Sequence, residues 1–503
     1  MGKERLPKHL RIQIKGWICS IILLVFLLAL LAAVIRTPFE EEVMDEGEGN
    51  QAPSPSEQET IQDSVRQIQS KIQKMGEIRV LLRNDGYEGL FHDRVSLRGS
   101  KDLRVTEEKE GRSKDDRLPA GEELTFRKGI GFFEDGQGVL TVSALDPEGE
   151  ILIDLERAEG VPGYRGKLEI RAVDEGLLII NQLPVEEYLR YVVPSEMPAN
   201  YPEEALKAQA ICARTYAYGK MLWPGYEEFD AHLDDSTAFQ VYHNCDEQEK
   251  TTKAIRETAG MVLWTKAGEL ADTYYYSTSC GRGTGAEIWM DEGEMGPDYL
   301  NAKQLTRTSV KSWQEKAPLL MGSWEADRDA EFLLEEREDD YECEEAWYRW
   351  HYDCLELSAE KFLRKLREVM GNEEITFMEI QDLEVTRRGD GGIAAELCIT
   401  TDGGRFAVCG EGAIRRLLCD GEGKVTLRDG SAYCPKEMLP SAFFLLAPRF
   451  EGKNVVGYSL IGGGLGHGVG MSQNCARQMA KEGMSAAEIL GFFYQGCVLG
   501  PIY

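Results

Sequence analysis

The most constraining feature of this sequence is the stretch PSEMPANYPEEALKAQAICARTYAYGK, residues 194–220, which places an acid directly before a long helix. Pro194 and Pro198 each fix φ at about −65° and push the preceding residue toward an extended conformation, so we expect Glu196 on a short, stiff loop. Pro202 suits the first helical position, and the Ala-rich run after it predicts a helix. The stretch is therefore a candidate active site with one carboxylate held in place.

The helix expected from Pro202 to about Met221 carries two cations on one face. Lys207 and Arg214 are seven residues apart and border an apolar stripe with three- and four-residue spacing. Such cations either border a cleft near Glu196 or belong to an ordinary core helix, with the arginine extending its charged end to the surface. The spacing alone favours neither interpretation.

The charge balance excludes one class of partner. The chain has 503 residues, of which 57 are Lys or Arg and 87 are Asp or Glu, and its formal net charge is −30. A field of this sign repels phosphate backbones, so we expect no binding to nucleic acid. The 12 cysteines include no C-x-x-C pair, which argues against a zinc ribbon or a thioredoxin-type motif. Cys343 and Cys354 are a candidate local disulfide.

The N-terminus predicts a membrane anchor. Five basic residues among the first 15 precede residues 16–35, which carry no charge and are long enough, at about 20 residues, to cross a bilayer as a helix. A cleaved signal peptide is the alternative, but its apolar region is usually shorter, about 7 to 15 residues. We expect an uncleaved single-pass anchor, with residues 1–15 in the cytoplasm and everything after Arg36 on the far side of the cell membrane.

The remainder of the chain divides into five regions by composition and periodicity. We expect an acidic linker at 36–76, a β-rich region at 77–182, a catalytic core at 183–290 with a short amphipathic helix before the Glu196 loop, an acidic insertion at 291–371 and a C-terminal part of the catalytic domain at 372–503. The predicted fold class is α+β: a transmembrane anchor, then a strand-rich extracytoplasmic domain whose helical lobe forms a cleft.

Two later loops are candidates for ligand binding. MVLWTKAGELADTYYYSTSCGR predicts a hairpin whose second strand runs into a loop where Ser277, Ser279 and Arg282 could bind hydroxyls or a carboxylate; a plain structural loop fits the spacing equally. The glycines of residues 462–470 surround His467 and lack the G-K-[ST] and G-x-G-x-x-G patterns of nucleotide sites. They allow either close backbone approach to a bulky ligand or a tight structural turn.

Four separated blocks resemble the stage II sporulation protein D (SpoIID)/LytB family of bacterial wall proteins. They reach from about Leu183 to the C-terminus in the family's order: LPVEEYLRYVVPSEMPANYPEEALKAQAICARTYAYGK, QVY, YYYSTSCGR and GGGLGHGVGMSQNCARQMAKEGMSAAEILGFFYQG. The resemblance implies a lytic transglycosylase that cleaves peptidoglycan glycan strands to 1,6-anhydro products, in sporulation or wall remodelling. For the LytB branch it implies instead a non-catalytic, glycan-binding enhancer of a cell-wall amidase.

The resemblance also assigns residues and partners. It implies that Glu196 is the catalytic acid and that Arg214 is a cleft residue needed for activity. The expected substrate-binding residues are Lys207, Gln240, Tyr242, Ser277, Ser279, His467 and Gln473. Some members hold zinc through a Cys and a His just before Q-x-Y, but LDDSTAFQVY has neither, so we expect no metal and no cofactor. The expected partners are glycan strands, the membrane through the N-terminal helix, and a wall amidase or other wall hydrolases.

A single carboxylic acid suffices for the implied reaction. It protonates the glycosidic oxygen and then accepts a proton from the sugar's own 6-hydroxyl, which attacks the anomeric carbon, whereas most glycosidases use two carboxyl groups. Glu196 must then start protonated near neutral pH, and its apolar neighbours would raise its pKa by desolvation. Reducing-end products would indicate a hydrolase instead, with Asp234, Asp235 or Glu287 as the second carboxylate.

Overall fold

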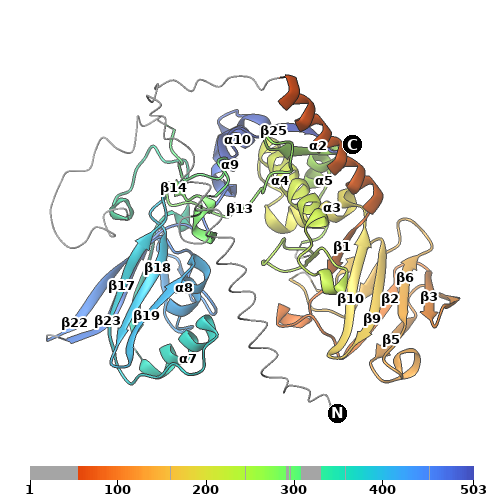
Figure 1. The fold of residues 1–503 in the computed structure, drawn as a ribbon, viewed down its shortest axis with the longest axis horizontal. Coiled ribbons are helices and arrows are strands. Elements are labelled where there is room, and N and C mark those ends of the chain that lie inside the picture. The colour runs from red at the N-terminus through yellow and green to blue at the C-terminus, as the bar shows by residue number, and fades with distance from the viewer. Residues whose placement is uncertain are drawn as a thin grey trace, which may run out of the picture. The chain divides into compact units, whose positions relative to one another are not determined.

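The structure, a computed structural model, describes residues 55–158, 160–243, 245–290, 294, 296–307, 330–356, 358–452 and 454–503. Residues Glu59–Tyr503 form one compact unit in which helices and several sheets are mixed (Figure 1). The α-helices of the described residues are α2 (Pro55–Met75), α3 (Val185–Glu196), α4 (Glu203–Leu222), α5 (Glu249–Glu257), α7 (Ala359–Met370), α8 (Glu411–Leu418), α9 (Gln473–Lys481) and α10 (Ala486–Phe493).

The region expected to be β-rich forms two sheets. The larger has the order β11-β1-β10-β9-β6-β3-β4, and all its pairs are antiparallel except β1 with β11. Strand β10, GLLIINQL, is buried along almost its whole length, as expected for a strand inside a sheet with both faces covered, whereas the outermost strand β4, RSKDDRL, is charged and exposed, which protects that edge. The strands are β1 (Ile78–Leu81), β3 (Leu103–Lys109), β4 (Arg112–Leu118), β6 (Val139–Ala144), β9 (Lys167–Val173), β10 (Gly176–Leu183) and β11 (Leu233–Asp234).

The second sheet of this region is smaller, with the order β5-β2-β7-β8. Its strands are β2 (Arg94–Gly99), β5 (Glu123–Arg127), β7 (Ile151–Ile153) and β8 (Gly163–Tyr164).

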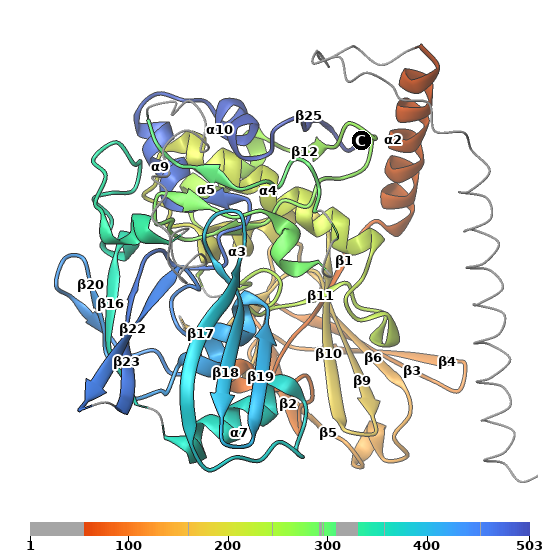
Figure 2. The ribbon, with the colours of Figure 1, turned by 60° about the vertical axis from the view of Figure 1, so that its left-hand side comes forward.

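The C-terminal half contains a five-stranded sheet, β21-β20-β16-β23-β22, and a three-stranded one, β17-β18-β19, whose strands lie side by side in Figure 2. These strands are β16 (Trp350–Glu356), β17 (Ile380–Arg388), β18 (Ala394–Thr401), β19 (Gly404–Cys409), β20 (Val425–Leu427), β21 (Ala432–Tyr433), β22 (Phe444–Glu451) and β23 (Asn454–Gly462). Strand β16 belongs to the segment expected as an acidic insertion and pairs with β20 and β23 on either side.

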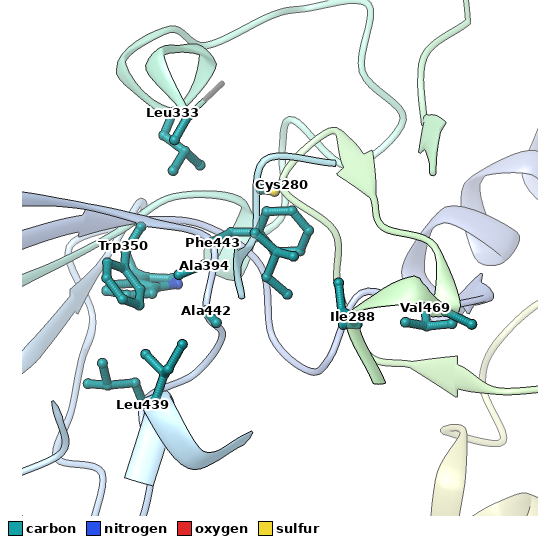
Figure 3. Packing of buried hydrophobic residues seen from close by; sticks show 14 of the residues in the cluster. Cys280, Ile288, Leu333, Trp350, Ala394, Leu439, Ala442, Phe443 and Val469 are labelled. Atoms are coloured by element: carbon teal, nitrogen blue, oxygen red, sulfur yellow. The ribbon is translucent and has the colours of Figure 1, made fainter. Parts of the chain in front are cut away.

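The described part of the acidic segment, from 330 onward, is thus built into the domain. Leu333 and Trp350 pack in one hydrophobic cluster with Cys280 of the Ser/Thr/Gly loop and Val469 of the glycine-rich loop (Figure 3). Residues 308–329 of the expected insertion lie outside the described residues. The segment predicted from its acidic composition to be an insertion therefore contributes both a central strand and core side chains.

Helix α4 is the centre of the helical layer. It contacts α3, α5, α9, α10 and strand β12, and 13 of its 20 residues are buried, which leaves few faces free (Figure 1). Its many alanines have small side chains, so neighbouring elements can approach from several sides. The helix expected from Pro202 to about Met221 is confirmed.

The local structure at the candidate acid differs from the expected loop. Glu196 is the last residue of α3 and does not lie in a loop, and Pro194 is inside the final turn. Proline's φ is compatible with a helix, and the hydrogen bond that it cannot donate is lost only two residues before the helix ends. The proline pair therefore did not exclude helix at Glu196.

The expected hairpin is present but short: Trp264 pairs antiparallel with Leu270, and the N–H of Ala271 donates to the carbonyl of Leu263 at 3.0 Å. Gly268 has a φ of +78° and donates to Thr265 at 3.0 Å, but the flanking strands take partners from the C-terminus. Strand β12 (Met261–Trp264) pairs with β25 (Val498–Pro501), and β13 (Tyr275–Tyr276) pairs in parallel with β24 (Met471–Ser472). A short two-stranded ladder, β14 (Arg282–Gly283) with β15 (Lys303–Gln304), follows.

Two further expectations need correction. The described chain is a mixed α+β fold, but no helix within the described residues is both long enough and apolar enough to cross a membrane, so the predicted fold class with its transmembrane anchor does not stand. The segment on which that anchor was predicted, 16–35, lies outside the described residues. Cys343 is a free thiol, so the expected disulfide with Cys354 is not formed.

A buried arginine ties α4 to the elements around it. The side chain of Arg214 is fully buried, and its Nε and Nη2 donate to the two carboxylate oxygens of Glu186 at 2.7 and 2.8 Å. Its remaining contacts include the carbonyls of Ile255 at 3.1 Å and Met261 at 3.3 Å. Glu186 lies in the first turn of α3, the helix that ends at the candidate acid. Arg214 therefore positions α3 against α4, α5 and β12.

We expect Arg214→Ala to lower the free energy of unfolding by about 3 kcal/mol, because it leaves a partly buried carboxylate and several carbonyls unpaired. Urea denaturation would measure this loss. The matched control is Arg94→Ala, which removes an ion pair with Asp154 whose two side chains are about half exposed, and should cost less than about 1 kcal/mol. Equal losses in the two variants would contradict the clamping role.

Candidate active site

The carboxyl of Glu196 lies in an environment that favours its neutral form. Its Oε1 accepts a hydrogen bond from the backbone N–H of Val241 at 2.6 Å, and the hydroxyl of Tyr275 also hydrogen-bonds this carboxyl. Burial raises the pKa of Glu196 from its usual 4.5 to about 7, although both hydrogen bonds act in the opposite direction. A large fraction of Glu196 is therefore protonated at neutral pH, as a general acid requires.

Tyr275 is the point at which three of the predicted blocks meet. Its hydroxyl accepts from Nε2 of Gln240 at 3.1 Å and is thereby oriented to donate to Glu196. Its carbonyl oxygen lies 3.0 Å from Nε2 of His467. The backbone N–H of Val469 donates to Nδ1 of the same imidazole at 3.2 Å, so the ring hydrogen is on Nε2 and is donated to Tyr275.

His467 acts here as a neutral hydrogen-bond donor. Burial lowers the pKa of His467 to about 4, so the ring carries no charge at neutral pH. The two glycines that flank it, Gly466 and Gly468, have φ values of +116° and +83°, and an added Cβ would lie 2.7 Å from Tyr276 and 2.6 Å from Phe443. The glycine-rich loop is thus a tight structural turn that aims His467 at the backbone of Tyr275.

The C-terminal block reaches the candidate acid from the other side. Parallel pairing of β13 with β24 sets Tyr275 opposite Met471, and Gln473 follows at the start of α9. Nε2 of Gln473 donates to the backbone oxygen of Glu196 at 3.0 Å and to Oε1 of Gln209 at 3.4 Å. The predicted residues Glu196, Gln240, His467 and Gln473 are therefore brought together, through Tyr275 and the end of α3.

The predicted serines lie in the loop after Tyr275 and stabilise it. The carbonyl of Ser277 accepts from the backbone N–H of Asn474 at 3.0 Å. Nδ2 of Asn474 donates to Thr278 at 2.9 Å, and its Oδ1 accepts from the hydroxyl of Tyr201 at 2.6 Å. This network joins the loop to α9 and to the turn after Glu196.

A second buried carboxyl, Glu342, joins the same two loops. The backbone N–H of Ser279 donates to its Oε1 at 2.9 Å, the hydroxyl of Ser279 donates to its Oε2, and the hydroxyl of Ser472 donates to its Oε1 at 2.7 Å. Ser472 is also the N-cap of α9. Burial raises the pKa of Glu342 to about 7, while its three hydrogen bonds act to lower it. Glu342 comes from the acidic segment and holds the loop of Ser279 against α9.

The three remaining predicted residues, Arg214, Lys207 and Tyr242, bond to partners other than Glu196. Arg214 is the buried clamp described above, and Lys207 is surrounded by carboxylates at 2.9 to 3.0 Å on Glu203, Glu204 and Glu257. The hydroxyl of Tyr242 is fully buried and donates to Oδ1 of Asn181 at 2.7 Å. The role of Arg214 in activity and the roles of Lys207 and Tyr242 in substrate binding stay predictions, and each of the three side chains makes a structural contact.

Sequence reasoning missed Tyr275 and Glu342. The block YYYSTSCGR was recognised, but three consecutive tyrosines carry no period that tells which of them faces the acid. Glu342 was one acid among many in an acidic segment, and only the fold shows that it is buried. The one available signal was that aromatic residues lie among the acids on both sides of Glu342, in DDYECEEAWYRW.

An aromatic surface lies beside the acid. Tyr274 makes edge contacts with Trp289 and Tyr216, at ring-centroid distances of 5.0 and 6.2 Å, and Trp289 lies 5.2 Å from the ring of His467. Trp289 is 40% exposed. Burial is the main cause of the raised pKa of Tyr216, and the nearby Glu196 adds to it, which places this ring within electrostatic reach of the acid.

Tyr216 also lines a cavity of about 580 Å³ together with Lys220, Trp223, Asp272 and Tyr299. Its volume falls within the range of about 300 to 1,000 Å³ that small-molecule sites occupy. The surface around Tyr216 thus combines aromatic rings with a few charged groups.

The histidines near the Q-x-Y block are engaged in the protein. Nδ1 of His232 accepts from the backbone N–H of Arg79 at 2.9 Å, and the ring of His243 stacks on Tyr191 at a centroid distance of 4.0 Å. Within the described ranges, no group of three or more His, Cys, Asp or Glu side chains is placed to hold a metal ion. The expectation of no metal stays a prediction.

Comparison with known proteins identifies two segments. The SpoIID family, described as "Stage II sporulation protein", matches residues 173–264, and a domain of unknown function, DUF8618, matches residues 286–470. The first segment contains Glu196, Arg214 and Gln240, and the second contains Glu342 and His467. The resemblance inferred from the four blocks is therefore confirmed.

Curated relatives carry the same family's names. The chain is 28% identical over 316 residues to the "Amidase enhancer" of Bacillus subtilis (strain 168), which covers 62% of this chain and 40% of that protein. It is 34% identical over 154 residues to "Stage II sporulation protein D" of the same organism, covering 28% and 42%, and 26% identical over 333 residues to the protein of that name from Bacillus amyloliquefaciens, covering 63% and 74%. The chain thus spans less than half the length of both Bacillus subtilis relatives.

We expect Tyr275→Phe to raise the pKa of Glu196 further, by about 1 unit, because it removes a hydrogen bond that favours the carboxylate. A carbon-13 NMR titration of the side-chain carboxyl carbon, assigned with Glu196→Gln, measures this directly. Tyr433→Phe, at an exposed tyrosine on β21, should leave the titration unchanged. A fall in the pKa in Tyr275→Phe would contradict the proposed contact.

We expect the stability of the protein to fall as pH rises from about 4.5 to about 7, in part because Glu342 is easier to protonate in the folded state than in the unfolded chain. Glu342→Gln keeps the shape and removes this titration, so its stability should fall less over the same interval, by up to about 3 kcal/mol. Denaturation at several pH values measures both proteins. Parallel stability curves for the two would contradict the assignment.

Proposed function

Because residues 173–264 match the SpoIID family, we propose that this chain is a lytic transglycosylase that cleaves peptidoglycan glycan strands, with Glu196 as its catalytic acid. The observation that carries this proposal is the pKa of about 7 for a carboxyl held by Val241 and Tyr275. Peptidoglycan lies outside the cytoplasmic membrane, so the proposal places the described domain there.

The proposed reaction uses one carboxyl in two steps. Protonated Glu196 gives its proton to the glycosidic oxygen as the bond from that oxygen to the anomeric carbon breaks. The 6-hydroxyl oxygen of the same sugar then bonds to the anomeric carbon, and its proton returns to Glu196. The products are a 1,6-anhydro sugar and a strand with a free hydroxyl, and the acid is regenerated.

A pKa near 7 suits both steps, because one group must donate and then accept a proton at the same pH. The hydrogen bond from Tyr275 stabilises the carboxylate formed after the first step, and burial stabilises the acid before it. Gln240 and His467 act on Glu196 only through Tyr275, so we assign both of them a positioning role.

The candidate second carboxylates of a hydrolase are occupied elsewhere. Asp234 is fully buried and accepts from Arg83 at 2.8 Å, and Asp235 is fully buried and accepts from Arg157 at 2.7 Å. Oε1 of Glu287 accepts from the backbone N–H of Asp390 at 3.1 Å. These contacts support a mechanism with a single carboxyl over one with a carboxyl pair.

The aromatic surface supports a glycan substrate. Sugar rings pack their C–H faces on aromatic side chains, and the partly exposed Trp289 lies directly against the ring of His467, at a centroid distance of 5.2 Å. We propose that this surface and the cavity at Tyr216 hold sugars on one side of the scissile bond.

The second candidate function is that of a non-catalytic enhancer of a wall amidase. It is favoured by the similarity to a relative named "Amidase enhancer", which aligns with 62% of this chain. In that case the aromatic surface and the cavity at Tyr216 would bind glycan, and Glu196 would not react.

We expect the purified domain to release 1,6-anhydro fragments from isolated sacculi and Glu196→Gln to reduce that release by at least about 1,000-fold, because the amide cannot donate the proton. Mass spectrometry of the released fragments distinguishes anhydro ends from reducing ends. Glu175→Gln, at an exposed acid, is the matched control and should retain full release.

Three other outcomes are informative. Reducing-end fragments would replace the transglycosylase by a hydrolase. An amidase stimulated equally by wild type and Glu196→Gln, with no fragments released by either, would establish the enhancer. Loss of folding in Glu196→Gln, visible by circular dichroism, would call for Glu196→Ala in its place.

A further inference from the structure

A basic cavity is lined in part by the residues that follow the candidate acid in the sequence. It has a volume of about 790 Å³, and Pro198, Asn200 and Tyr201 on its wall belong to the turn between α3 and α4. The remaining wall comes from α4, from α5 and from α9. The cavity is therefore distinct from the aromatic cavity at Tyr216, although both lie close in sequence to the ends of α3 and α4.

The cavity is positive in a strongly negative protein. Four cations line it, Lys250, Lys253, Arg477 and Lys481, against one acid, Glu203, whereas the whole chain has a formal net charge of −30. Such a concentration of one sign in a concave site attracts ligands of the opposite sign.

Two of these cations are available to a ligand. Lys253 pairs with Glu203 at 2.7 Å, and Arg477 pairs with Glu345 while its guanidinium lies 5.0 Å from the ring of Tyr201. By contrast, the exposed Lys250 and Lys481 have no ion-pair or hydrogen-bond partner among the residues that the structure describes. The paired cations are held in place, and the unpaired ones extend the positive wall.

Helix α9 connects this cavity to the acid. Gln473, Arg477 and Lys481 are spaced by four residues and lie on one face, which runs about 12 Å along the helix at a rise of about 1.5 Å per residue. The first of them bonds the backbone oxygen of Glu196, and the other two line the cavity. A glycan positioned at Glu196 would therefore have its neighbouring substituents near this wall.

We propose that this cavity binds a carboxylate of the glycan next to the bond that is cleaved. The carboxylate is carried by muramic acid, either on its lactyl group or on the peptide attached to that group. The volume exceeds what a single small anion needs and suits a substituent of several heavy atoms. Lys250 and Lys481 supply the unpaired charge, and Arg477 supplies a planar donor fixed on Tyr201. The ligand class rests on the proposed function, because the substrate is the wall glycan.

Binding to Glu196→Gln tests the proposal without requiring cleavage. Three soluble probes of equal sugar length differ in charge: a wall fragment with its stem peptides, the same fragment after the peptides are removed, which exposes the lactyl carboxylate, and a neutral chito-oligosaccharide. Isothermal titration calorimetry measures the affinity of each at low and physiological salt.

We expect Lys250→Glu/Lys481→Glu, introduced into this background, to weaken binding of at least one carboxylate-bearing probe by about tenfold, and less at high salt. Binding of the neutral oligosaccharide should not change. The control Lys101→Glu/Lys424→Glu makes the same change in net charge at two exposed lysines elsewhere and should leave all three affinities unaltered.

The probe that responds identifies the source of the carboxylate, the lactyl group or the peptide. Equal loss for the neutral probe, equal loss in the control pair, or no loss for either charged probe would overturn the proposal. Failure to cleave sacculi would leave this binding result intact, so the two proposals fail separately.

Discussion

The site depends on one balance, between the burial of the Glu196 carboxyl and the two hydrogen bonds that it accepts. Burial raises the pKa of this carboxyl, and the hydrogen bonds from Val241 and Tyr275 lower it. Together they set a pKa of about 7. Neighbouring side chains hold Tyr275 and Glu196 in the positions that this pKa requires. Gln240 orients the hydroxyl of Tyr275, His467 holds its backbone, and Gln473 holds the backbone of Glu196.

Long-range contacts assemble the site from two recognisable segments and from the stretches beside them, which carry Tyr275 and Gln473. The SpoIID segment, 173–264, provides the acid and its helices, and the DUF8618 segment, 286–470, provides His467 and Glu342. Glu342 draws together the loop of Ser279 and the N-cap of α9, so the second segment shapes the loops that meet at the acid. This gives the domain of unknown function a definite structural part in the candidate site.

Local patterns in the sequence predicted what local physics determines. Pro202 and the alanines that follow specify α4, and the alternating and apolar strands of the β-rich region are present. Local patterns did not determine the end of α3, because a proline in the last turn of a helix costs little stability. They also did not determine the pairing of β12 with the C-terminal strand β25, because a strand's partner is not encoded in its own residues.

The candidate site shows the same division. Family blocks identified Glu196, Gln240, His467 and Gln473, which the fold brings together. They gave no means to distinguish a buried Arg214 clamp from a cleft residue, or to select Tyr275 among three tyrosines, because burial is a property of the assembled core.

The pH dependence of kcat/KM for release of anhydro fragments tests whether a protonated Glu196 is the catalytic acid. If it is, activity falls above a pH of about 7, with a slope of −1 on a logarithmic scale, because kcat/KM reports the acid of the free enzyme and one proton on Glu196 is required. Activity that stays constant to pH 9, or that falls already above the usual carboxyl pKa of 4.5, would contradict it.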